Sequence, residues 1–159
     1  MITIRRIEPH EVSIAKDLIY RVAYRVFNDT RPLEESVAFY ESRGTLADMD
    51  DIPQTYFESD GTFLIMTDED RIIGTGAIRK LDDTICELKR VWLLFEYHGR
   101  GLGYRMIQEL LPLPGEKGTR GCDLKQIEII NTGHTSSTDA SAFMRSRATP
   151  ATRMRLQWR

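Results

Sequence analysis

A glycine-rich break between an apolar run and a periodic helical pattern constrains this chain more than any other feature. Residues 91–95 form the apolar run, and three glycines then fall within five positions, at Gly99, Gly101 and Gly103. Apolar residues recur at i, i+4 spacing over 102–111, as on one face of a helix. The stretch therefore predicts a strand, a glycine loop and a helix in succession.

This arrangement suits the binding of an anion. Glycines let the backbone approach a ligand closely, and a helix N-terminus adds free N–H groups and a partial positive charge. Arg100 and Arg105 place cationic side chains beside the loop. A phosphate-bearing ligand is the first hypothesis, and a loop that only turns the chain is the alternative. Neither G-x-x-x-x-G-K-[ST] nor a G-x-G-x-x-G after a first strand is present.

The residues around the loop resemble a known family. Residues 86–93 read CELKRVWL, and EYHGRGLG follows two residues later. Together they closely resemble motif A of the GNAT superfamily of acetyl-CoA-dependent N-acetyltransferases. The family pattern Q/R-x-x-G-x-G/A falls on His98, Gly101 and Gly103. His98 replaces the usual Arg or Gln, and Phe95 stands where a Pro is common.

The order of elements along the chain agrees with this family. Alternating apolar and polar residues predict the first strand, and Pro9 with its acidic neighbours suits the first turn of a helix. We predict strands over 2–7, 62–67, 71–80 and 85–94, and helices over 8–26, 33–42 and 102–111. The resemblance implies an α/β (α+β) protein with the GNAT-like acyl-CoA N-acyltransferase fold, a mixed, mostly antiparallel sheet flanked by helices. Residues 1–111 would form its acetyl-CoA-binding core.

Composition is that of a soluble globular protein. The 159 residues suffice for one domain with a hydrophobic core, at 41% hydrophobic and 29% charged residues. No apolar run is long enough to span a membrane, and the N-terminus does not read as a signal peptide. We expect a cytoplasmic protein without a membrane partner. Cys86 and Cys122 have no metal or redox spacing, so we predict free thiols and no metal.

Residues 112–159 depart from the family, which would place here a fifth strand, a helix carrying a Tyr and a final hairpin. Only residues 126–130 read as a strand. We interpret this atypical segment as translated in a shifted frame. When each third codon base is joined to the next two bases, residues 143–149 permit Tyr-Glu-Lys-Gln-Gly-Tyr. That resembles the family's F-Y-E-K-x-G-F/Y motif, which carries the usual general acid. A genuine, divergent or disordered tail is the alternative.

Sequencing the coding DNA across codons 108–118 distinguishes the two interpretations of the tail. We expect that restoring one frame yields the missing strand, the Tyr-bearing helix and the last strand. Stop codons scattered through the other frame would instead establish the tail as genuine.

The expected binding partners follow from the distribution of charge along the chain and from the interpretation of residues 112–159 as translated in a shifted frame. Residues 112–159 are net basic and residues 1–111 net acidic, a pattern that also suits a nucleic-acid binder. We attribute the basic tail to the shifted frame and expect no nucleic acid. Loss of half a sheet would expose apolar surface on residues 85–111, which predicts association as a homodimer.

The resemblance implies acetyl-CoA as cosubstrate and no metal. Its pyrophosphate would lie on the glycine loop, and its pantetheine along the fourth strand. For His98, solvation on the loop is the alternative to phosphate contact. The residues carried over as the acetyl-CoA site are Leu93, Leu94, His98, Gly99, Arg100, Gly101, Leu102, Gly103 and Tyr104.

The implied reaction moves an acetyl group to a primary amine of a small molecule, peptide or protein by direct attack on the thioester. A base must then deprotonate the ammonium. Glu87 matches the family's acidic strand position and is the candidate, acting through water. The alternative is a strand carboxylate paired with Lys89 or Arg79. Residues 45–60 are expected to form a loop-like, acidic segment, and its acidic residues at 48–60 suit a cationic amine or only solubility. A non-catalytic acyl-CoA-binding or regulatory domain is the competing function.

Overall fold

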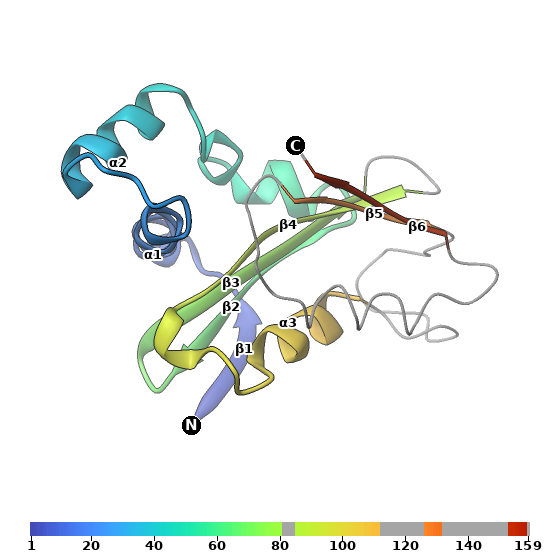
Figure 1. Ribbon diagram of the computed structural model, residues 1–159. Helices are drawn as coiled ribbons and strands as arrows, with labels where there is room; N and C mark the ends of the chain where they lie inside the picture. Colours follow the sequence, from blue (N-terminus) through green and yellow to red (C-terminus); the bar gives the residue numbers. More distant parts are fainter. Residues whose placement is uncertain (81–84, 112–125, 132–152, 159) are drawn as a thin grey trace.

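The computed structural model describes residues 1–80, 85–111, 126–131 and 153–158, and these form a six-stranded sheet with strand order β1-β2-β3-β4-β5-β6 (Figure 1). Within the first four strands, each pairs antiparallel with the next. In contrast, β5 runs parallel to β4, and β6 runs parallel to β5. The strands are β1 (Ile2–Arg6), β2 (Thr62–Asp68), β3 (Arg71–Lys80), β4 (Ile85–Leu93), β5 (Gln126–Asn131) and β6 (Arg153–Trp158).

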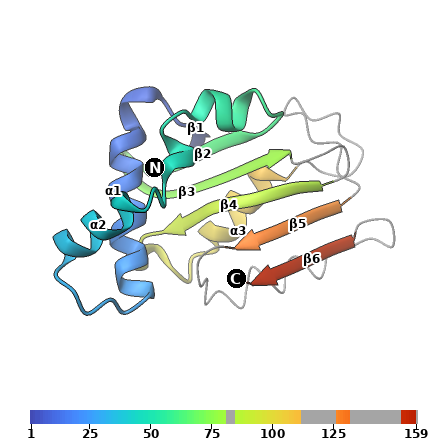
Figure 2. The same cartoon turned by 90° about the horizontal axis from the view of Figure 1, so that it is seen from above.

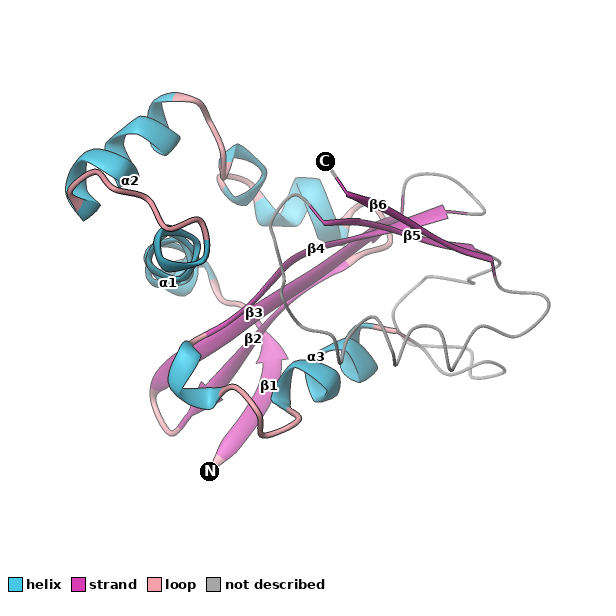
Figure 3. Ribbon diagram, viewed as in Figure 1, coloured by secondary structure: helices cyan, strands magenta, loops and turns pink. Residues whose placement is uncertain are grey.

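Helices cover both faces of the sheet (Figure 3). One face carries α1 (Val12–Val26) and α2 (Leu33–Ser42), together with short helical turns at Ala47–Met49 and Pro53–Phe57. The opposite face carries α3 (Leu102–Leu110), which follows the glycine loop. None of the helices in the described part of the chain has the length and apolar character needed to cross a bilayer.

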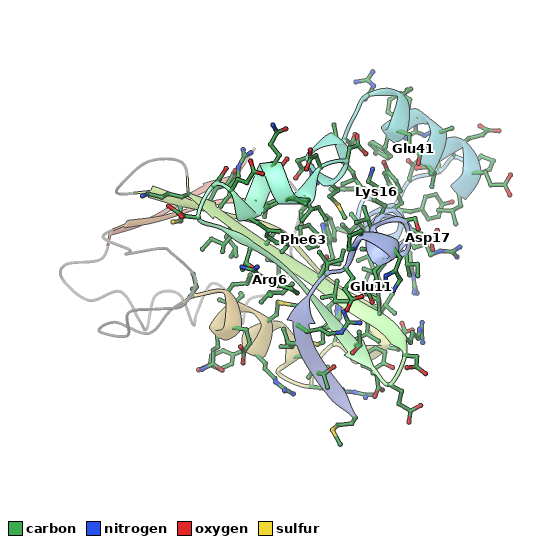
Figure 4. All side chains as sticks on the ribbon, turned by 180° about the vertical axis from the view of Figure 1, so that it is seen from behind. Arg6, Glu11, Lys16, Asp17, Glu41 and Phe63 are labelled. Atoms are coloured by element: carbon green, nitrogen blue, oxygen red, sulfur yellow. The ribbon has the colours of Figure 1, made fainter. Side chains whose placement is uncertain are left out.

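Two hydrophobic clusters hold these layers together, one on each face. The larger joins the buried side of α1 to β2, where Phe63 is fully buried between sheet and helices (Figure 4). Met49, Ile52 and Tyr56 also belong to this cluster. Residues 45–60, expected to be a loop-like acidic segment, therefore contribute core side chains. Their helical spacing explains this, because positions 49, 52 and 56 share one side of the turns.

The second cluster packs α3 against the sheet through a glycine. Met106, Ile107 and Leu110 are each 2% exposed. A Cβ at Gly76 of β3 would lie 2.8 Å from both Leu110 Cδ1 and Met106 Cγ, so glycine allows this close approach without displacing the two side chains. The position of α3, and of the loop before it, is thus fixed by the sheet.

A β-bulge in β4 changes which side chains face which helix. The β3–β4 register shifts between Thr75 and Ala77, and Arg90 has a φ of 56°. Leu88 and Leu93 pack in the α3-side cluster, whereas Trp92 packs on the α1 side. Uninterrupted alternation would put residues 88 and 92 on the same face, so the bulge separates them.

The predicted elements up to residue 111 are confirmed with small shifts at their ends. The largest is at α1, where a 3-10 turn at Pro9–Glu11 precedes the helix. The predicted strand at 126–130 corresponds to β5, and β6 lies in the segment expected to be irregular. Its other residues, including the window 143–149, lie outside the described residues. Cys86 is disulfide-bonded, so the expectation of a free thiol there is wrong.

Candidate active site

One edge of β4 is left open by its neighbour in the sheet. β5 pairs with β4 only through Ile85, Cys86 and Glu87. From Leu88 to Leu93, β5 supplies no ladder partner, and Figure 2 shows β4 continuing past the end of β5. Backbone N–H and C=O groups on this side of β4 can therefore pair with an extended ligand.

The glycine loop continues from this end of β4. Gly99 and Gly101 have φ values of 74° and 71°, a left-handed conformation that favours glycine. Gly103 differs, because it lies in the first turn of α3 without a positive φ, and a Cβ there would meet nothing within 4 Å. Within the described part of the chain there is thus no steric or conformational reason for glycine at this position.

The N-terminus of α3 is arranged to accept an anion. Its N-cap is Gly101, which has no side chain that could accept a hydrogen bond from the first N–H groups of the helix. Arg100 lies over the Tyr97 ring, with Cζ 5.2 Å from the ring centroid. An uncapped helix N-terminus beside a glycine loop and a cation fits a phosphate or pyrophosphate group.

The other predicted cofactor residues are tied into the loop. His98 Nε2 donates to the Leu93 carbonyl at 3.0 Å, and its ring stacks on Phe95 with centroids 5.0 Å apart. The Leu94 N–H donates to the Ile73 carbonyl at 2.9 Å, and the Leu94 carbonyl accepts from Tyr97 at 3.0 Å. The backbone of Leu94 is therefore already hydrogen-bonded within the chain, and its contact with pantetheine stays a prediction.

Glu87 lies on the α1 side of β4 in an ion-paired environment. Arg79 Nε donates to Glu87 Oε2 at 2.6 Å, and Lys89 Nζ lies 4.0 Å from Oε1. The Glu87 side chain is only 6% exposed. The structure thus contains the ion pair that was the alternative to a base, but the carboxylate is buried rather than facing solvent. Its catalytic role stays a prediction.

A second carboxylate, that of Asp48, adjoins this pair, and its side chain is 14% exposed. Arg90 donates to both oxygens of Asp48, with Nε 3.1 Å from Oδ2, and also to the Thr45 carbonyl at 2.8 Å. The Tyr56 hydroxyl donates to Asp48 as well. Lys89 Nζ lies 3.8 Å from Asp48 Oδ2 and so connects the two carboxylates.

Protonation states in this cluster follow from burial and pairing. Burial raises the pKa of Asp48, but hydrogen bonds from Arg90 and Tyr56 and the nearby positive charges outweigh it, so that the pKa lies below its usual value. Burial, followed by the hydrogen bond to Asp48, raises the pKa of Tyr56 well above its usual value. Asp48 is therefore an anion and Tyr56 a neutral donor at neutral pH.

A cavity of about 300 Å³ opens beside this cluster, between α1, α2 and β4. Its apolar wall includes Tyr20, Tyr40 and Trp92, and its polar wall includes Lys89 and Arg90. The cavity is therefore separated by β4 from the side of the sheet on which α3 packs. Among the described residues, no group of three or more His, Cys, Asp or Glu side chains could hold a metal ion.

Comparison with known proteins identifies the family. The sequence model of the acetyltransferase (GNAT) family matches residues 23–125. The chain belongs to the GNAT acetyltransferase family. The resemblance found in the sequence is thus confirmed. No curated protein matches the sequence significantly.

Solved GNAT structures share the fold at low sequence identity. The putative acetyl transferase of Pyrococcus furiosus has a TM-score of 0.62 at 14% identity, covering 94% of this chain and 93% of that chain. The GNAT-family acetyltransferase of Staphylococcus aureus MU50 has a TM-score of 0.57 at 19% identity, covering 69% and 63%. This chain thus spans less than two thirds of the latter. PaiA N-acetyltransferase of Thermoplasma acidophilum, solved with coenzyme A, has a TM-score of 0.53 at 18% identity, covering 69% of each chain.

Sequence reasoning missed the cavity and the Asp48 cluster. The adjacent basic residues Lys89 and Arg90 in a largely buried strand were one signal, because a cation on such a strand needs an anionic partner. Asp48 was the partner, but it lies 42 residues away in sequence from Arg90. No spacing rule connects positions so far apart.

Replacing Asp48 by Asn should destabilise the protein strongly. The substitution leaves Arg90 buried without its anion, for which we expect a loss of about 3–5 kcal/mol in the free energy of unfolding. The folded-state pKa of Asp48 is lowered, so its stabilisation is complete above the unfolded pKa and disappears as pH falls through the folded value. Urea unfolding of both proteins should show a constant difference above about pH 5 that shrinks below about pH 4.

Asp17→Asn is the matched control, since Asp17 forms an exposed ion pair with Arg21 on α1. We expect little change from this variant. A loss for Asp48→Asn as small as that for Asp17→Asn would show that the buried network contributes nothing to stability.

Proposed function

We propose that this protein transfers the acetyl group of acetyl-CoA to a primary amine of a small molecule or protein. The observation that carries the proposal is Gly103, a glycine in a helix that neither backbone conformation nor neighbouring atoms require. Glycine in a helix costs up to about 1 kcal/mol relative to alanine. A phosphate that approaches the N-terminus of α3 closely supplies a reason for it.

The open edge of β4 supports the same ligand. The pyrophosphate would contact the N–H groups of residues 99–104, beside the C-terminal end of β4. The pantetheine arm carries amides and can pair with the backbone of β4 beyond Glu87, where β5 leaves it without ladder partners. Acetyl-CoA bound in this way brings its thioester alongside the strand that also forms one wall of the cavity.

The reaction then needs little beyond positioning and proton transfer. The neutral amine nitrogen forms a bond to the thioester carbonyl carbon, and the carbon–sulfur bond breaks. A backbone N–H of β4 polarises the carbonyl. We assign to Glu87 the removal of the proton from the ammonium group through a water molecule. The CoA thiolate leaves and takes up a proton to become the thiol.

A non-catalytic acyl-CoA-binding or regulatory domain is the second candidate. The ion pair between Glu87 and Arg79 favours it, because a buried carboxylate held at 2.6 Å by a guanidinium also has a purely structural explanation. This candidate predicts acetyl-CoA binding without turnover of any amine. A cytoplasmic location and a homodimer belong to the proposal on sequence grounds only.

Gly103→Ala tests the ligand. The added methyl group should hold a phosphate away from the first N–H groups of α3, which we expect to weaken acetyl-CoA binding by about tenfold or more. Because the methyl meets no atom of the described residues within 4 Å, stability should be unchanged or raised by about 0.5–1 kcal/mol. Calorimetry measures the Kd, and urea unfolding measures the stability.

Gln108→Ala, an exposed change later in α3, is the control and should leave the Kd unchanged. Equal affinities for wild type and Gly103→Ala would place the pyrophosphate elsewhere and remove the main support for the proposal.

Glu87→Gln tests the base. We expect kcat/KM at neutral pH to fall by about 100-fold or more, with partial recovery at alkaline pH as more amine becomes neutral. Binding of acetyl-CoA should be unaffected. Glu11→Gln is the control for Glu87→Gln. Glu11 is also a buried carboxylate and forms an ion pair with an arginine, Arg5, at 2.7 Å.

Equal losses in the two variants, each in proportion to lost stability, would reduce Glu87 to a structural residue. Acetyl-CoA binding by the wild type without turnover of any amine would favour the regulatory domain.

A further inference from the structure

The cavity between α1, α2 and β4 has a definite chemical character. Aromatic rings come from Tyr20 on α1, Phe27 directly after α1, Tyr40 on α2, and Trp92 on β4. Its volume of about 300 Å³ is in the range of a site for one small molecule. These aromatic walls suit an acceptor with an aromatic or bulky aliphatic part, provided that the acceptor also carries a group that can pair with the polar side chains of the cavity.

The polar wall carries an excess of positive charge. Among the described residues, the connected cluster holds three cations, Arg79, Lys89 and Arg90, against two anions, Asp48 and Glu87. Arg79 and Arg90 each have a close carboxylate partner. The ion pairs of Lys89 are longer, at 3.8 and 4.0 Å, although its side chain is only 13% exposed. A buried cation without a close anion is costly, and a bound anion relieves that cost.

The acidic groups nearby do not reverse this balance. Asp50 pairs with Lys16, and Asp51 accepts from the Gln54 N–H at 3.0 Å. Figure 4 shows Glu41 on α2 and Lys16 on α1, on the same side of the sheet. Glu41 is exposed to solvent, where water screens its charge. Asp48, Asp50 and Asp51 thus each have a partner within the chain, so these three carboxylates do not favour a cationic acceptor.

We propose that the acceptor is an amine that also carries a carboxylate and an apolar or aromatic side chain, as in a free amino acid, with Lys89 binding the carboxylate. This inference rests on the proposed acetyl transfer and narrows its substrate class. The apolar part lies among the rings of α1 and α2. The carboxylate lies against the polar wall of β4, which keeps the neighbouring amine close to the strand along which the thioester lies. A polyamine, with no anion and several positive charges, is repelled by the same wall.

The test compares acceptors that differ in a single group. L-Phenylalanine, phenethylamine, which lacks only the carboxylate, and spermidine are each assayed with saturating acetyl-CoA, and release of the CoA thiol is followed. We expect kcat/KM for phenylalanine to exceed that for phenethylamine by about tenfold or more, the size of one charge-assisted contact. Spermidine should be the poorest acceptor.

Lys89→Met should remove the preference for phenylalanine, and Lys89→Arg, which keeps the charge, should retain it. Lys16→Met is the control, since Lys16 pairs with Asp50 outside the cavity. It should leave the ratio unchanged. If Lys89→Met does not fold, the wild-type ratio and Lys89→Arg still test the proposal. Preference for phenethylamine or spermidine, or an unchanged ratio in folded Lys89→Met, would overturn it.

Calorimetry with the holo complex separates this proposal from acetyl transfer itself. With CoA present, phenylalanine should bind more tightly than phenethylamine even if no turnover occurs, and equal affinities would overturn the inference. Turnover of spermidine alone would leave acetyl transfer intact and reject the amino-acid acceptor. Failure to bind acetyl-CoA would reject the proposed function, while phenylalanine binding would still report on the cavity.

Discussion

The bulge at Arg90 is the constraint on which the rest of the site depends. A non-glycine residue at a φ of 56° costs about 1–3 kcal/mol, and this one is held by surrounding contacts. The Arg90 guanidinium is bound to Asp48, and its carbonyl accepts from the Thr75 hydroxyl at 2.7 Å. Through the bulge, β4 keeps Leu88 and Leu93 in the core under α3 while Trp92 faces α1. The cavity and the glycine loop are both built on this one strand.

The fold up to residue 111 was largely predictable because its signals are local. The apolar face of α1, the alternation in the strands and the glycine loop each lie within about 15 residues of sequence. The predictions failed where the deciding contact was distant. Residues 45–60 read as an acidic loop because Asp48 meets Arg90 only after the chain has folded. Similarly, nothing in the local pattern around Cys86 indicated that it would be disulfide-bonded.

The candidate site also has one part with local sequence signals and another that depends on contacts between distant residues. Gly99, Gly101 and Gly103 were recognisable, since a glycine loop before a helix is continuous in sequence and has a direct physical meaning. The cavity was not, because its walls come from two helices and a strand that are far apart in the chain. The sequence therefore led to a specific hypothesis for the cosubstrate but to none for the acceptor, for which only the packed structure provides the arrangement of charge.

The sheet separates the two ends of the proposed reaction. The glycine loop leads into α3, which packs on one face, and the cavity lies on the other face, so β4 is the common wall between them. A donor at the glycine loop and an acceptor in the cavity would not compete for space, and neither would have to depart before the other arrives. The layout therefore favours a ternary complex in which both are bound at once, and it requires no acetylated form of the enzyme.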